Sequence, residues 1–115
     1  MNVDWTRINS FITEGDEEEM QWLREMIQTL IDNYEERLKE LDTLTKNPDN
    51  SQLVSLLHQM KGVASNFGLD NLWRLTQEAE LLLKAGNLDA TLKETQKFSP
   101  IWQETKNELK TKLNI

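Results

Sequence analysis

His58, the only histidine of the chain, is the side chain best suited to chemistry near neutral pH, because a neutral imidazole is a nucleophile. Apolar residues on either side of it recur at helical spacing and predict a helix whose buried face points away from His58. The outward face then carries small or polar side chains together with one cation, namely Val54, Ser55, Lys61, Gly62 and Ser65. We therefore expect His58 to be a surface histidine among small neighbours.

The residues that follow His58 suit the acceptance of a phosphoryl group. Lys61 lies one helical turn after His58 and could offset the charge of the group as a point charge. Gly62 covers the adjoining surface, although a glycine inside a helix costs about 1 kcal/mol relative to alanine. A site that needs close approach to the imidazole would justify this cost, which makes Gly62, Ser65 and Val54 candidate binding residues.

A carboxylate on the next helix is a candidate partner of the imidazole. If two antiparallel helices turn at residue 69, His58 and Glu80 lie opposite each other, because each is eleven residues from the turn. Glu80 could accept a hydrogen bond from Nδ1–H, fix the tautomer and leave Nε2 as the nucleophile. Lys84, one turn further on, would add a second cation near the site. This combination indicates a phosphate acceptor.

The first half of the chain predicts a lid and a long helix. Apolar residues over 5–12 form one stripe and predict a short N-terminal lid helix that ends before Gly15. Apolar residues from Asp16 to Leu44 then step by three and four, which predicts one long amphipathic helix. Its first turn is acidic and complements the positive end of the helix dipole.

A helical hairpin follows, and it would carry the candidate site. Asp49 and Gln52 resemble a capping box that opens a third helix, which Gly68 ends. Asp70 is expected to cap a fourth helix, which Gly86 ends.

The remaining stretch, residues 88–113, is amphipathic and is either one kinked helix or two. Ser99 and Pro100 read there as an N-cap followed by proline at the first helical position. Short loops between long helices predict an all-α fold, an antiparallel up-and-down four-helix bundle with the short N-terminal lid helix. At 115 residues we expect a single domain over residues 1–115.

The third helix also resembles a known family, the histidine-containing phosphotransfer (Hpt) domains. Their signature reads His-x-x-Lys-Gly followed by a glycine six residues later, and the matching residues are His58, Lys61, Gly62 and Gly68. Leu57 departs from the many members that have alanine there, which on the buried face would alter packing rather than chemistry. The resemblance runs from residue 16 to residue 86, and the final stretch matches only in pattern.

The resemblance implies roles for individual residues. His58 would be the phosphorylated residue, Lys61 would stabilise the phosphoryl group and Gly62 would give the partner access. The family also has Gln or Glu, hydrogen-bonded to the histidine, at the position of Glu80, and some members have a basic residue at the position of Lys84.

The function implied is that of a phosphorelay intermediate in two-component signalling. His58 would accept a phosphoryl group from the aspartate of a receiver domain and donate it to another. The expected partners are response-regulator receiver domains and a sensor histidine kinase. The chain would be a phosphoryl carrier and not an autonomous ATP-dependent kinase, with no intrinsic cofactor and with Mg²⁺ on the partner receiver domain.

The amino-acid composition argues against several other classes of function. A net charge of −7 disfavours binding to nucleic acid and to anionic lipid surfaces. The absence of cysteine removes thiol redox chemistry and thiolate metal sites, and a reducing cytoplasm is the expected location. No stretch is apolar enough for membrane insertion, and no signal peptide pattern is present. A monomer is expected.

Two other roles for His58, in a metal site or in serine catalysis, have less support from the sequence. One alternative function stays open. A bundle metal site would need Glu-x-x-His, but residue 55 is serine, so no metal site is expected. Ser65 lies near His58 by helical spacing, but no oxyanion hole accompanies it. The alternative is a non-catalytic helical adaptor, which would dock on its partner whether or not His58 is phosphorylated.

Overall fold

A computed structural model describes residues 1–115 and shows six helices and no strand. The helices are α1 (Trp5–Asn9), α2 (Glu17–Lys46), α3 (Asn50–Phe67), α4 (Asp70–Lys84), α5 (Leu88–Thr95) and α6 (Phe98–Leu113). The prediction of an all-helical chain is therefore confirmed. No helix combines the length and the apolar composition that crossing a bilayer requires.

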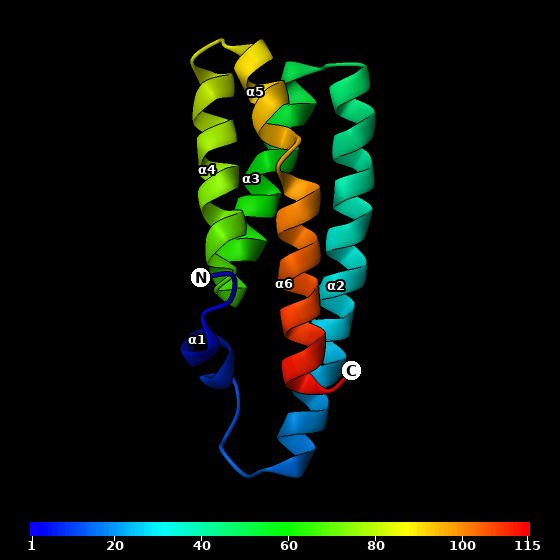
Figure 1. The fold of residues 1–115 in the computed structure, drawn as a ribbon, viewed down its shortest axis with the longest axis vertical. Helices are drawn as coiled ribbons and strands as arrows, with labels where there is room; N and C mark the ends of the chain where they lie inside the picture. The colour runs from blue at the N-terminus through cyan, green and yellow to red at the C-terminus, as the bar shows by residue number, and fades with distance from the viewer.

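The long helices lie side by side along a molecule of 48 × 21 × 21 Å. Figure 1 shows α2, α3, α4 and α6 parallel to this axis, each running opposite to the long helix before it in the chain. Helices α3 and α4 form the most closely packed pair, and α5 packs mainly against α4. One cluster of 23 buried apolar residues fills the space between the helices, which therefore share a single core.

Side chains at the helix starts explain where α2 and α3 begin. The carboxylate of Asp16 accepts the backbone N–H of Glu19 at 3.1 Å, which satisfies one of the free donors at the start of α2. Asp49 accepts the backbone N–H of Gln52 at 3.0 Å in the same way at the start of α3. At the far end of α3, Gly68 is left-handed with φ of 66°, a conformation that glycine adopts without strain.

The start of α4 differs from the expectation. Leu69, not Asp70, occupies the N-cap position, and no side chain caps the helix. Leu69 is fully buried in the tight turn between α3 and α4, so packing decides where the helix begins. Asp70 instead lies in the first turn, where its charge still complements the helix dipole.

Residues 88–113 form two helices, and the predicted cap between them is wrong. Helix α6 begins at Phe98 with Lys97 at its N-cap, and Pro100 is its third residue. The first backbone N–H groups of a helix have no partner within it, so a proline at this position removes no hydrogen bond. Phe98 is 1% exposed, and its burial accounts for the earlier start.

The N-terminal segment is held on the end of the α3–α4 hairpin. The backbone N–H of Asp4 donates to the carbonyl of Gly68 at 2.7 Å, and Arg7 Nε donates to the carbonyl of Asn66 at 2.9 Å. Helix α1 is shorter than expected and ends at Asn9. Phe11, beyond its end, packs edge-on against Phe67 with ring centroids 5.9 Å apart.

Candidate functional site

His58 projects from the outward face of α3, and 72% of its side chain is exposed. The apolar residues that precede and follow it at helical spacing, such as Leu57 and Met60, are fully buried and fix this orientation. An imidazole in this position contributes little to the core and is open to a second protein.

Glu80 lies beneath this histidine and is almost completely buried, with 5% of its side chain exposed. Its Oε1 accepts hydrogen bonds from Lys84 Nζ at 2.8 Å and from Lys61 Nζ at 3.1 Å. The pairing of α3 with α4 thus brings His58, Lys61, Glu80 and Lys84 together, and we name these four residues the Glu80 cluster. Its lysines contact Glu80, which the sequence did not predict, although Glu80 and Lys84 have the four-residue spacing of helical ion pairs.

The two oxygens of Glu80 are used unequally. Oε2 has no hydrogen-bond partner although it is buried, and it lies 3.9 Å from His58 Nδ1. This separation is longer than a hydrogen bond, so the expected bond between Glu80 and the imidazole is not formed in this conformation. Nδ1 is nevertheless the ring nitrogen that faces the carboxylate, and Nε2 is the nitrogen left available.

The surroundings of Glu80 favour its ionised form. Burial alone would raise the pKa of its carboxyl group, but the hydrogen bonds from Lys84 and Lys61 and the charges of both lysines outweigh this effect. The pKa of Glu80 therefore lies below its ordinary value. A stable negative charge is thereby kept beneath the imidazole.

The remaining candidate residues border His58 on α3. Gly62 is exposed, and a Cβ atom added to it would have no neighbour within 4 Å. Nothing inside the molecule therefore requires glycine at this position. Ser65 is exposed, whereas Val54 is half-buried and packs partly against the core, so Val54 offers a partner less surface than the sequence suggested.

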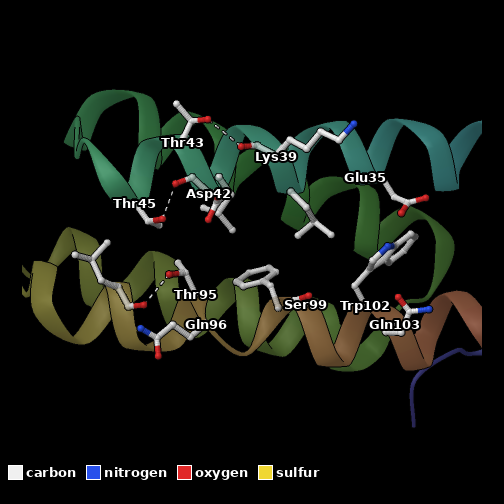
Figure 2. Close-up of a pocket in the computed structure, with 14 residues that line it drawn as sticks. Glu35, Lys39, Asp42, Thr43, Thr45, Thr95, Gln96, Ser99, Trp102 and Gln103 are labelled. Carbon is white, nitrogen blue, oxygen red and sulfur yellow. Dashed lines mark hydrogen bonds between the residues drawn. The ribbon is translucent and has the colours of Figure 1, made fainter.

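A wide groove lies elsewhere on the surface. A groove of about 800 Å³ runs between α2 and the α5–α6 segment, and Trp102 forms part of its wall (Figure 2). None of its lining residues belongs to α3 or α4. In the Glu80 cluster, by contrast, His58 projects into solvent above a buried carboxylate. No group of three or more His, Asp or Glu side chains is arranged to hold a metal ion.

Comparison with known proteins identifies the family of the chain. The family model of the Hpt domain matches residues 25–113, which is most of the chain and includes every residue of the Glu80 cluster. The match begins within α2 and continues through α6, so it extends further towards the C-terminus than the resemblance in the sequence did. Searches of curated proteins and of solved structures found no match. From the family match and the residues that it contains, we conclude that the chain belongs to the Hpt domain family.

Proposed function

We propose that this protein is a phosphorelay intermediate that carries a phosphoryl group on Nε2 of His58. The Hpt domain family carries out histidine phosphotransfer in two-component signalling, and this chain belongs to it. The observation that supports the proposal best is an exposed imidazole whose Nδ1 faces a buried, ionised carboxylate 3.9 Å away. A carboxylate on the Nδ1 side of the ring favours the tautomer with its proton on Nδ1, and this tautomer presents the lone pair of Nε2 to a partner.

The proposed step is an in-line transfer from the phosphorylated aspartate of a receiver domain. The Nε2 lone pair forms a bond to phosphorus while the P–O bond to the aspartate breaks, and its electron pair returns to the carboxylate. Nδ1 keeps its proton throughout, so positive charge develops on the ring beside Glu80. The reverse sequence of events donates the group to a second receiver.

The chemistry is divided between the two proteins in this proposal. This chain supplies the oriented imidazole and the nearby cations, and the partner supplies Mg²⁺ and the acidic pocket that holds it. A carrier of this kind is phosphorylated by a kinase and does not itself use ATP. The partners are receiver domains and a sensor histidine kinase, and the open surface over Gly62 is where we place the receiver.

The remaining parts of the proposal concern the module as a whole. We take residues 1–115 as one Hpt module that acts as a cytoplasmic monomer. Its scaffold is an up-and-down bundle of four helices, with α5 and α6 together forming the last, and the N-terminal segment serves as a lid over the end of the α3–α4 hairpin.

Transfer from a phosphorylated receiver domain tests the function. Wild-type protein should gain a label that is stable in base and labile in acid, as expected of a phosphorus–nitrogen bond. His58→Gln should remain unlabelled while keeping its circular dichroism spectrum, because an outward side chain contributes little to the core. Gln59→Ala, which alters the exposed neighbour, is the control and should be labelled normally.

Two results would contradict the proposal. Labelling of His58→Gln at the wild-type level would place the phosphoryl group on another residue. Tight docking of the receiver without any transfer to wild-type protein would instead favour the non-catalytic adaptor.

A further inference from the structure

A second hollow lies between α2 and α3, and we name it the α2–α3 hollow. It has a volume of about 350 Å³, and its apolar walls are formed by Met26 and Leu30 from α2 and by Val63 and Phe67 from α3. None of its lining residues belongs to the Glu80 cluster. Small-molecule sites have volumes of about 300–1,000 Å³, so this hollow has room for a molecule with a single ring or a short chain.

Arg37 is the only charged residue that lines the α2–α3 hollow. Its Nε is buried and has no hydrogen-bond partner, and its Nη1 reaches only the carbonyl of Asn33, at 3.5 Å. No carboxylate lies within ion-pair distance of the guanidinium, and the neighbouring Glu36 pairs with Lys39 instead. The hollow therefore contains a positive charge that no acidic side chain balances.

These surroundings favour one class of ligand. Apolar walls favour a ring or an alkyl chain, because its apolar surface leaves water when it enters the hollow. A guanidinium presents its N–H donors in a planar fork, which matches the two oxygens of a carboxylate. A molecule with a carboxylate at one end and a single ring or short chain at the other satisfies both requirements. A neutral ring would leave the charge of Arg37 unpaired, and a bare anion would leave the walls uncovered.

We propose that the α2–α3 hollow binds small amphipathic carboxylates, with the carboxylate paired to Arg37 and the apolar end packed against Met26, Val63 and Phe67. The Phe67 ring is held by its edge-on contact with Phe11, so this wall is in place before a ligand binds. The site goes beyond the proposed relay, because the Glu80 cluster lies where α3 meets α4 and the hollow lies where α3 meets α2.

Titration of the full chain with phenylacetate, followed by carbon-13 NMR of methyl groups, tests the proposal. The methyl signals of Met26, Leu30 and Val63 should shift and saturate, with a dissociation constant of about 1–10 mM for so small a ligand. Two matched ligands each lack one end of the molecule: phenylacetamide has no charge, and acetate has no ring. Each should bind at least about tenfold more weakly than phenylacetate.

Two arginine variants test the role of the guanidinium. Arg37→Met removes the charge and keeps an apolar stem, so phenylacetate should bind at least about tenfold more weakly. Arg74→Met makes the same change at an exposed residue of α4 outside the hollow, and this control should bind as the wild type does. The comparison of the three ligands uses wild-type protein alone, so it decides the question even where a variant does not fold.

Three results would overturn the proposal. The first is the absence of shifts at a phenylacetate concentration about tenfold above the expected dissociation constant. The second is equal binding of phenylacetamide, or unchanged binding to folded Arg37→Met, because the charge would then not select the ligand. The third is a set of shifts confined to Leu38 and Leu92, which would place the ligand in the groove between α2 and the α5–α6 segment. No phosphoryl donor or receiver domain enters these measurements, so they fail separately from the proposed function.

Discussion

Glu80 presents two oxygens with opposite surroundings, one crowded by lysines and one facing His58 without a partner. The sequence predicted that Glu80 and His58 face each other, because a helical hairpin that turns at a known residue fixes which residues are opposite. It could not predict which oxygen each lysine takes, since this depends on side-chain rotamers that no spacing determines. The same limit explains why the lysines were expected at the phosphoryl group and lie on Glu80 instead.

Replacing Gly62 should move stability and transfer in opposite directions. Gly62→Gln should stabilise the isolated protein by up to about 1 kcal/mol, because glycine is a poor helix former and the site has room for a side chain. The same side chain would cover the surface beside His58 and slow transfer from a receiver domain. Urea unfolding and transfer kinetics measure the two effects. An unchanged transfer rate would mean that the receiver does not approach over Gly62.

The lowered pKa of Glu80 predicts a stability difference that depends on pH. A carboxyl group whose pKa is lower in the folded state stabilises the fold when ionised, and this contribution is lost as the pH falls through the folded-state value. Wild-type protein should therefore be more stable than Glu80→Gln at pH 7, and the difference should shrink below the ordinary glutamate pKa of about 4.3. Thermal melts of both proteins between pH 7 and pH 3 measure this trend. A difference that grows on acidification would contradict the assigned direction.

At the scale of elements, periodicity predicted which segments are helical but not where each one starts. Asp49 was recognisable as the start of a helix because its side chain caps the backbone directly, whereas Asp16, expected in the first turn of α2, is its N-cap. The starts of α4 and α6 follow the burial of Leu69 and Phe98, which is a tertiary effect that no local signal announces. The burial of Phe98 also decides that residues 88–113 form two helices and not one.

Replacing Gly68 should destabilise the contact between the end of α3 and the N-terminal segment. It has φ of 66°, and an added Cβ atom would lie 2.9 Å from Asp4 Cβ. Gly68→Ala should lower the free energy of unfolding by at least about 1–3 kcal/mol, the usual cost of a left-handed alanine. Gly15→Ala separates the two causes, because Gly15 has φ of 83° but open space around it. Equal losses in the two variants, measured by urea unfolding, would show that the contact with Asp4 has no effect.

At the scale of the whole molecule, the core and the site occupy different helical faces. Tyr34 on α2 stacks on Trp102 on α6, with ring centroids 4.5 Å apart, and ties together helices that carry no residue of the Glu80 cluster. Burial raises the pKa of the Tyr34 hydroxyl, which lies inside the core. The stability of the bundle and the chemistry at His58 should therefore respond to different substitutions.

A substitution in this stack should weaken the bundle and leave the site competent. Trp102→Ala should cost about 3–5 kcal/mol in urea unfolding, the usual range for an aromatic residue removed from a core. Its phosphorylation rate with phosphoramidate should match the wild type at a temperature where both proteins are folded. Tyr34→Phe is the control, because it keeps the stacked ring and removes only the hydroxyl, and it should change the free energy of unfolding by no more than about 1.5 kcal/mol. A site that fails in folded Trp102→Ala would show that core and site are coupled.

The position of Glu80 Oε2 beneath His58 has a consequence for the reversibility of the proposed transfer. In the resting protein this oxygen lies 3.9 Å from Nδ1, which is too far for a hydrogen bond. A phosphorylated ring would carry a positive Nδ1–H, and a small shift would let it donate to the ionised carboxylate, so the contact would favour the phosphorylated side of the equilibrium. Stabilising that side would bring the two ends of the reaction closer in free energy. An equilibrium constant nearer to one would let the same histidine take the group from one protein and release it to another.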